Sequence, residues 1–364
     1  MSSLYGGSVA AVTASGLASA HRLPSRPLDD DGFAELLALC ERHRVLGLLG
    51  VAVRDGAFPV NDAQRDDLAR LWEAWLAHAV RVERVLLEIL DALEPEPVTI
   101  LALKGLALAH TSYPDPDARV FGDVDVLVAP GGLHRAADVL VRTFGGTRAE
   151  PELAPGFDDR FGREAMVRVR NIEIDLHRTF VNGAYGSRIR LESLFDEPEV
   201  ITVGGRAVPV PAPTHRLLHA AYASTLSDWP PRLVAYRDLA QVIAHDDPAP
   251  ATVLAAAEAW RAEAVLAAGI TDAWRALRLT ERPALLEWAQ RYRSTRRDRA
   301  LMAASRGPAR GYTSQLTSVI AIPGFRDRVA FLRAITWPSQ EYRDARHLGR
   351  FGLLGSGTRR AMRR

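Results

Sequence analysis

Two kinds of hydrophobic pattern divide this chain into three stretches. Apolar positions recur at helical spacing from Asp29 to Leu93, short apolar or alternating runs follow from Val98 to about residue 212, and helical spacing returns from Thr214 onward. A helical period indicates amphipathic helices, whereas strict alternation indicates half-buried strands. The pattern therefore predicts a central α/β or α+β unit, flanked by N-terminal and C-terminal helical regions.

Breaks between these patterns give the predicted domain limits. We expect a disordered lead-in over 1–28, a helical region over 29–95, a mixed core over 96–212, a helical domain over 213–345 and a basic tail over 346–364. The lead-in is rich in Ser, Gly and Ala and lacks the basic start and apolar centre of a secretory signal. Two prolines, Pro95 and Pro97, end the first helical region because proline cannot continue a helix.

Several single elements can be predicted with their ends. A long helix should run from Asn61 or Asp62 to about Leu93, and a second from Leu133 to Phe144, ended by Gly145-Gly146. Two hairpins are expected. One joins Glu164–Arg170 to Asn171–His177, and the other turns at Gly204-Gly205 within 200–210.

Composition and charge exclude several classes of protein. Hydrophobic residues make up 48% and charged residues 25%, with 46 basic against 44 acidic side chains and a net charge of +2. Such a balance gives no global field that calls for nucleic acid or a membrane surface, and no run approaches the roughly 18 apolar residues of a membrane span. The single Cys40 excludes an intrachain disulfide and a cysteine metal cluster. We expect a soluble, cytoplasmic protein without nucleic-acid or membrane partners.

The clearest chemical signal begins where an apolar run ends. Residues 98–103 are predicted to form a strand that stops at Lys104-Gly105, where the backbone can approach an anion closely at the start of a helix. Asp123 and Asp125 follow, separated by one residue in a strand-like segment, so both carboxylates should project from one face. Two such acids repel each other unless a cation lies between them.

A third carboxylate lies on a later alternating segment. In Asn171–His177 the apolar residues take one face, and Glu173, Asp175 and His177 take the other. If this strand lies beside the first, Asp175 comes next to Asp123 and Asp125. Three hard oxygen ligands suit Mg²⁺, whereas one histidine among acids makes a poor zinc site.

Taken together, these residues resemble the nucleotidyltransferase superfold of the DNA polymerase β type. More narrowly, they resemble the bacterial uncharacterised nucleotidyltransferase family over about residues 30–345. The matching positions are Lys104, Gly105, Tyr113, Arg119, Asp123, Asp125, Asp175 and His177, with a helical block from His215 to Asp238. One departure is that Leu106 follows Gly105, where the superfamily usually has Ser or Gly, so Lys104 is the natural substitute as a phosphate contact.

The resemblance implies an α+β fold with a small mixed sheet and helices, and a metal-dependent transferase activity. The protein would move NMP from an NTP, expected to be ATP, to a hydroxyl or phosphate of an acceptor, with release of pyrophosphate. Two Mg²⁺ ions would be held by the catalytic Asp123, Asp125 and Asp175, while Lys104, Gly105 and Arg119 would bind nucleotide phosphates. His177, His219, Arg232 and Asp238 would contact the acceptor or support the site. The acceptor (a small molecule, peptide or protein) and the oligomeric state stay open.

Several of these residues could instead have purely structural roles. Arg119 could pair structurally with Asp117 or Asp123, and Asp238 or Arg232 could belong to a structural ion pair. His215 and His219 share a helical face, but no glutamate lies between them and no third ligand follows, which disfavours zinc. Thr214 is predicted to cap that helix. The arginine-rich stretch 291–310 lacks interleaved aromatics, so we expect a solvated or phosphate-steering surface.

Two further functions remain open from the sequence. A related transferase could act on a phosphorylated or sugar-nucleotide substrate in the tailoring of a peptide or natural product. An inactive nucleotide-binding module, regulatory or part of a toxin–antitoxin pair, is the other. The presence of all three acids disfavours an inactive module, which would be free to lose them.

Overall fold

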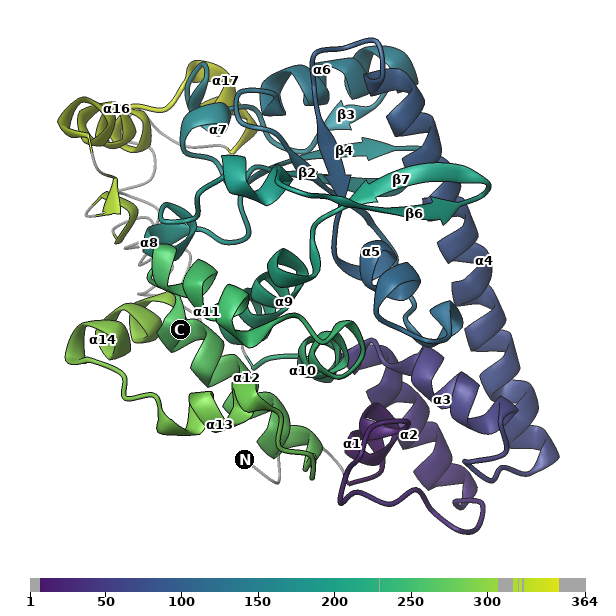
Figure 1. Cartoon of the computed structure of the whole chain (residues 1–364). Helices are drawn as coiled ribbons and strands as arrows, with labels where there is room; N and C mark the ends of the chain where they lie inside the picture. Colours follow the sequence, from purple (N-terminus) through teal and green to yellow (C-terminus); the bar gives the residue numbers. More distant parts are fainter. Residues whose placement is uncertain (1–6, 229, 307–316, 320, 323, 347–364) are drawn as a thin grey trace, which may run out of the picture. The chain divides into compact units, whose positions relative to one another are not determined.

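The computed structural model of the chain describes residues 7–228, 230–306, 317–319, 321–322 and 324–346 (Figure 1). These residues form two compact units, each assembled from separate stretches of the sequence. The first unit takes in residues up to 87 together with 102–122 and 197–295, and the second takes in 88–101, 123–196 and the stretch from 296 onward. Helices and a small sheet give the α+β fold that the sequence predicts.

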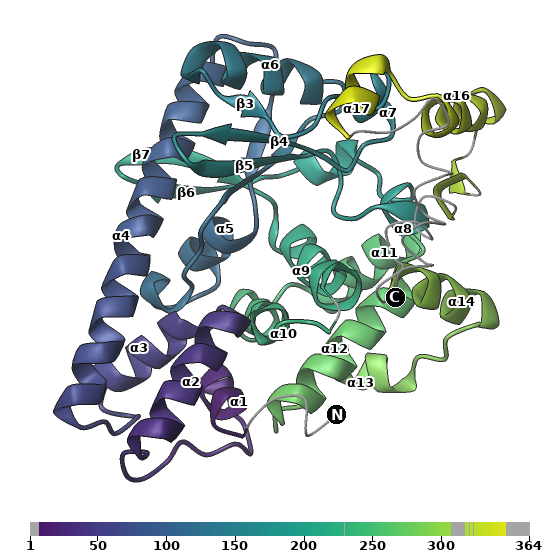
Figure 2. The same ribbon diagram turned by 180° about the vertical axis from the view of Figure 1, so that it is seen from behind.

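The second unit is built on a five-stranded mixed sheet with the strand order β1-β2-β5-β4-β3. Figure 2 shows β4 and β5 next to each other in this sheet. β2 and β5 run parallel, whereas β4 is antiparallel to both β5 and β3. The strands are β1 (Ile100–Ala102), β2 (Val124–Val128), β3 (Thr147–Arg148), β4 (Glu164–Val169) and β5 (Ile172–His177).

The predicted hairpin of β4 and β5 is confirmed, including its turn. Arg170 and Asn171 both have positive φ angles, 48° and 65°. Two successive left-handed residues are typical of the tight turn whose twist matches paired strands. The alternation is also confirmed, since Ile172, Ile174 and Leu176 are buried.

Helix α6 (Leu133–Phe144) packs on β4 and β5 and has the limits that the sequence predicts. Its buried residues recur at helical spacing, and Gly145 ends it in the left-handed conformation. Further helices in the described part of this unit are α7 (Phe157–Arg160), α8 (Gly183–Gly186), the 3-10 helix η2 (Glu192–Phe195), α14 (Arg296–Ser305), α16 (Phe325–Thr336) and α17 (Gln340–Ala345).

The first unit is mainly helical, with α9, α10 and α12 packed together (Figure 1). The predicted hairpin at Gly204-Gly205 is confirmed as β6 (Glu199–Val203) and β7 (Arg206–Val210). The long helix α4 (Asp62–Leu93), also predicted, continues from this unit into the second. The other elements are α1 (Gly7–Ala14), α2 (Asp30–His43), α3 (Leu46–Arg54), α5 (Lys104–Thr111), η1 (Pro116–Ala118), α9 (Pro213–Tyr222), the π-helix η3 (Ala223–Ser227), α10 (Leu233–Gln241), the π-helix η4 (Val242–Asp246), α11 (Pro250–Ala259), α12 (Glu263–Leu277) and α13 (Ala284–Arg291).

The expectation of a disordered lead-in is wrong for the part that the structure describes. Residues 7–14 form α1, whose Val9 and Val12 are fully buried and which packs on α10 and α12. Further along, the Ser19 hydroxyl donates to the Leu277 carbonyl over 2.6 Å. The expectation rested on the content of Ser, Gly and Ala. Alanine, however, is a strong helix former, and tertiary packing supplies the stability of this helix. Residues 1–6 lie outside the described part.

The start of α9 differs from the predicted one. Thr214 does not cap α9, because the helix already begins at Pro213 and Ala212 occupies the capping position without a side-chain bond. Proline suits the first helical position since its fixed φ is already helical. Apart from Arg346, the predicted basic tail lies outside the described residues, as do residues 307–310 of the arginine-rich stretch. No helix in the described ranges has the length and apolar character needed to cross a membrane.

Candidate metal and nucleotide site

Asp125 and Asp175 lie side by side in the sheet of the second unit. The parallel register of β2 and β5 pairs these two residues directly, so that both side chains leave the same face. On the other face of the same strands, Val124, Val126 and Ile174 are almost completely buried. The apolar alternation thus fixes which way the carboxylates point, and the predicted proximity of Asp125 and Asp175 is confirmed.

His177 connects the two neighbouring strands of β5. Its Nε2 lies 2.7 Å from Asp125 Oδ1 and its Nδ1 lies 3.2 Å from Glu164 Oε2. The imidazole is only 2% exposed, and the hydrogen bond between Nε2 and Asp125 fixes the orientation of the ring, whereas the contact with Glu164 is close but is not a hydrogen bond. The sequence suggested that His177 orients Asp175 or meets the acceptor, whereas its close carboxylate partners are Asp125 and Glu164.

The group Asp125, Asp175 and His177 could hold a metal ion, since one ligand atom from each lies within 4.8 Å of the others. The two carboxylates offer the hard oxygen ligands that Mg²⁺ prefers. The imidazole is a softer ligand, and its position between Asp125 and Glu164 suits it to orienting a carboxylate. The donor set therefore fits a carboxylate-bound Mg²⁺ with the histidine as a supporting group.

Asp123 immediately precedes strand β2, which carries Asp125. It is half-buried, directly before β2 begins at Val124, and it is not a member of the three-residue group. Its side chain is two residues from Asp125, as the sequence pattern requires. Its role as a third ligand remains a prediction.

Lys104 and Gly105 begin α5 in the first unit, as the sequence predicts. The left-handed residue is Lys104, with φ 49°, whereas Gly105 is required for space. A Cβ on Gly105 would lie 2.6 Å from the Phe121 Cβ, closer than such atoms approach in proteins. The backbone at the start of this helix is thus both strained and closely packed.

Arg119 is engaged by a residue that the sequence did not indicate as its partner. Its Nε and Nη2 donate to the two oxygens of Asp238 over 2.7 and 2.9 Å, and Tyr113 donates its hydroxyl to the same carboxylate over 2.8 Å. All three residues are buried, and burial raises the pKa of Tyr113 well above its usual value, with the Asp238 charge adding to the effect. The fork that would grip a phosphate is occupied in this first-unit network.

The other helical candidates occupy different environments in the first unit. Arg232 precedes α10 and pairs with Asp228 over 3.3 Å, so Asp238 and Arg232 have separate partners. His219 is buried in α9, and the His215 ring stacks on Trp260 with centroids 5.8 Å apart. Within the described residues, neither histidine belongs to a group of potential metal ligands.

Glu164 is the member of the site that the sequence analysis missed. The sequence pattern indicates Glu164 only as the first residue of a hairpin arm. In an antiparallel hairpin, however, residues equally far from the turn face each other, and the Arg170-Asn171 turn pairs Glu164 with His177. Counting back from the predicted turn would have identified it.

The sequence matches one protein family, and the fold has distant likenesses among solved structures. A family model described as uncharacterised nucleotidyltransferase matches residues 29–278. No curated protein matches the sequence. The matching solved structures include a solution structure of the antibiotic-resistance factor ANT(2″)-Ia, which is 13% identical, covers 50% of this chain and 92% of that chain, and has a TM-score of 0.36.

Two further structures are similarly distant. The crystal structure of ANT(2″)-Ia in complex with adenylyl-2″-tobramycin is 14% identical and covers 49% of this chain and 96% of that chain, with a TM-score of 0.36. An antigenic nucleotidyltransferase-like protein from Paracoccidioides brasiliensis is 17% identical and covers 58% of this chain and 97% of that chain, also with a TM-score of 0.36. Likenesses at this level carry no conclusion about the present chain.

Proposed function

The chain belongs to the uncharacterised nucleotidyltransferase family, and from that premise we propose that it transfers NMP from an NTP to a hydroxyl or phosphate of an acceptor, releasing pyrophosphate. The observation that carries this proposal is the direct pairing of Asp125 with Asp175 on parallel strands. Two carboxylates held side by side in a sheet repel each other, and a cation bound by both relieves that repulsion.

We assign the cation as Mg²⁺, held by Asp125 and Asp175 with Asp123 as a further ligand. Bound there, it would neutralise the charge that develops on the leaving pyrophosphate and make the acceptor hydroxyl more acidic. Asp175 is the half-buried member of the pair and would take the proton of that hydroxyl on its carboxylate. His177, in close contact with Glu164, keeps Asp125 in one orientation.

Lys104 and Gly105 are proposed to bind nucleotide phosphate at the start of α5. A helix N-terminus presents free backbone N–H groups, and a lysine there adds a full positive charge. Arg119 is better suited to holding Asp238 in place than to binding phosphate, because its guanidinium already makes a bidentate pair with that carboxylate. We expect ATP to be the preferred donor.

The proposal can be tested by the melting temperature of the full chain with ATP, GTP, CTP or UTP, each with and without Mg²⁺. A ligand that binds only the folded state adds about 2.7 kcal/mol at a hundredfold excess over its Kd. We expect a Mg²⁺-dependent rise with ATP that is lost in Asp125→Asn and in Asp175→Asn. Because each variant is compared with itself without ligand, a change in its basal stability does not affect the result.

Glu173→Gln is the matched control. It removes a carboxylate from the same strand and face as Asp175, but the Glu173 side chain is 46% exposed and its partner is Arg168 at 2.6 Å. This variant should keep the full Mg²⁺-dependent rise. An equal rise in Asp125→Asn, or no rise with any nucleotide in the wild type, would overturn the proposal.

A further inference from the structure

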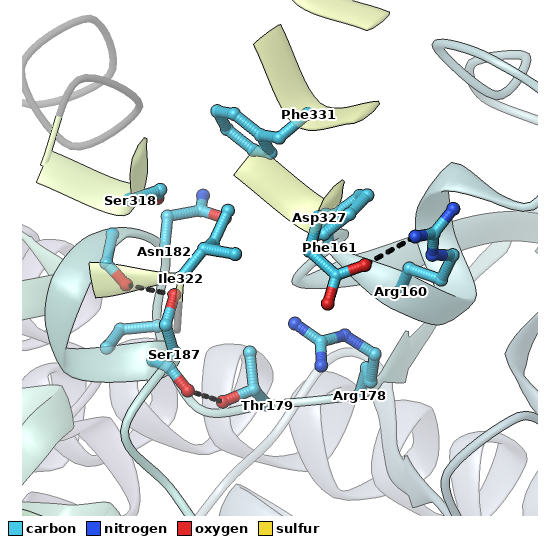
Figure 3. A pocket seen from close by; sticks show the side chains of 13 residues that line it. Arg160, Phe161, Arg178, Thr179, Asn182, Ser187, Ser318, Ile322, Asp327 and Phe331 are labelled. Carbon is cyan, nitrogen blue, oxygen red and sulfur yellow. Dashed lines mark hydrogen bonds and ion pairs between the residues drawn. The ribbon is translucent and has the colours of Figure 1, made fainter. Parts of the chain in front are cut away.

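A pocket of about 130 Å³ lies where the chain leaves β5 in the second unit (Figure 3). Its wall includes Arg178, the residue directly after His177, and it extends to residues of α16. A neighbouring cavity of about 350 Å³ shares Phe161, Asn182 and Phe331 with it. Together the two spaces could admit a molecule larger than a single ion.

Arg178 is the central charge of this pocket. Its Nε donates to the Gly162 carbonyl over 2.7 Å, which fixes the plane of the guanidinium. Figure 3 shows the rest of the guanidinium directed into the open centre of the pocket. Asp327 also lines the pocket, but its carboxylate is paired with Arg160 at 2.6 Å. Among the described residues, no carboxylate forms an ion pair with Arg178.

A mostly buried cation in this position favours an anionic ligand. Burial lowers the pKa of the Arg178 guanidinium, and the charges of Asp159 and Asp158 offset this only in part. Burying a charge is costly unless a counter-charge or hydrogen bonds compensate it. The planar guanidinium can donate two parallel hydrogen bonds to a carboxylate or a phosphate, which is a stronger arrangement than a single carbonyl contact.

The other walls of the smaller pocket combine polar side chains with an apolar surface, the polar ones being Thr179, Asn182, Ser187 and Ser318. Three carboxylates line the larger cavity, and each is paired with an arginine: Glu150 with Arg346, Asp158 with Arg148 and Glu164 with Arg163. Asn182 lines both spaces and makes no side-chain bond to the start of α8. Phe331 packs between two aromatic rings, with centroid distances of 5.7 Å to Phe157 and 5.5 Å to Phe161. A ligand with an anionic group and an apolar or aromatic part would match both kinds of wall.

The larger cavity also reaches the candidate metal site. Glu164 is one of its lining residues, and the same carboxylate contacts His177 Nδ1 at 3.2 Å. Arg178 itself follows His177 in the chain. A molecule bound in these spaces would therefore lie next to the residues that orient Asp125.

We propose that this pocket binds the acceptor through an anionic group, a carboxylate or a phosphate, held by Arg178 and Asn182, with its apolar part against Phe161 and Phe331. The inference rests on the proposed function, because it names the class of acceptor used by that site. The acceptor is thus a carboxylated or phosphorylated molecule with an apolar portion.

The test measures direct binding by calorimetry on the full chain, without metal or nucleotide. The probes are phenyl phosphate and benzoate, with benzyl alcohol as the neutral analogue. We expect at least one anion to bind and benzyl alcohol not to bind. Arg178→Gln should weaken the anion about tenfold or more, since it removes a charge-assisted hydrogen-bond pair. The stronger of the two anions identifies the acceptor group as phosphate or carboxylate.

Arg168→Gln is the matched control, because Arg168 is an exposed arginine of β4 that does not line the pocket. It should change the affinity by less than twofold. If Arg178→Gln does not fold, Asn182→Asp tests the same site, since Asn182 is exposed and an added negative charge should repel the anion.

Two results would overturn the proposal. One is equal binding of the anions to the wild type and to Arg178→Gln or Asn182→Asp. The other is displacement of phenyl phosphate by inorganic triphosphate whose own binding is lost in Arg178→Gln, which would make the pocket a donor-phosphate site. Either outcome leaves the nucleotide and Mg²⁺ test of Asp125 and Asp175 untouched, so the two failures are distinguishable.

Discussion

Lys104 and Gly105 each meet a different structural requirement at the start of α5. Gly105 has no room for a side chain because of Phe121, while Lys104 takes the left-handed backbone conformation that glycine adopts more readily. An L-residue in that region costs about 1 kcal/mol or more. A glycine at position 104 would avoid this cost but would lack the ammonium group that we propose for phosphate binding.

Substitutions at Lys104 should separate strain from charge. Lys104→Gly and Lys104→Ala both remove the ammonium group, but only glycine relieves the backbone strain at φ 49°. We expect the glycine variant to be about 1 kcal/mol more stable than the alanine variant in urea denaturation. Both should lose most of the nucleotide-dependent rise in melting temperature. Equal stability of the two variants would show that the position carries no strain.

The residues of the site could be predicted from the sequence to different degrees. Asp125, Asp175 and Lys104 could be proposed because each belongs to a local pattern of strand alternation or of a strand followed by a helix, and their roles stay predictions. The partner of Arg119 was not found, since Asp238 lies 119 positions away and only nearby acids could be considered from the sequence. Glu164 could have been reached only by counting back from the predicted turn to the partner of His177, and Arg178 carries no local signal. The roles proposed for both depend on the space and partners that the fold gives them.

Helix α6 shows the same contrast at the scale of an element. Its limits were predicted from apolar spacing and the closing glycines, but Gly132 at its start has no side chain to cap it. Asp159 provides the cap from 26 residues away, since its Oδ1 accepts the Leu133 N–H at 2.8 Å and the His134 N–H at 3.2 Å. Negative charge at a helix N-terminus also interacts favourably with the helix dipole.

Removal of this distant cap should destabilise the protein measurably. Asp159→Ala leaves two N–H groups of α6 without their acceptor, and we expect a loss of about 1 kcal/mol in the free energy of unfolding by urea. The control is Asp138→Ala, which removes an exposed acid from the same helix and should cost less than about 0.5 kcal/mol. A similar loss in both variants would mean that Asp159 does not act as a cap.

The elements that were predicted correctly share a local cause. The long helix α4, helix α6 and both hairpins follow from periodicity and turn residues within a single stretch. The parallel pairing of β2 with β5 joins Asp125 to Asp175 across 50 residues, and no local pattern specifies its register. Helix α1 was missed for a related reason, because its stability depends on packing against α10 and α12 rather than on its own sequence.

On the scale of the whole molecule, one carboxyl group is expected to affect the pH dependence of folding. Burial raises the pKa of Asp158 from 3.8 to about 6, and the charges of Glu152 and Asp159 add to the effect, although the ion pair with Arg148 opposes it. Between these two values the folded protein keeps a proton that the unfolded chain has lost. Stability from this group is therefore fully present below pH 3.8 and is lost as the pH rises through about 6.

Asp158→Asn should remove this pH dependence, because asparagine does not titrate. We expect the free energy of unfolding of the wild type, minus that of the variant, to fall by about 2 to 3 kcal/mol between pH 4 and pH 7, measured by urea denaturation at several pH values. The variant also leaves Arg148 without its carboxylate, but that cost is similar at each pH and cancels in the slope. Asp67→Asn, which removes an exposed carboxylate in α4, serves as the control. A difference that rises with pH would mean that the ion pair with Arg148 outweighs burial, and Asp158 would then stabilise the fold at neutral pH.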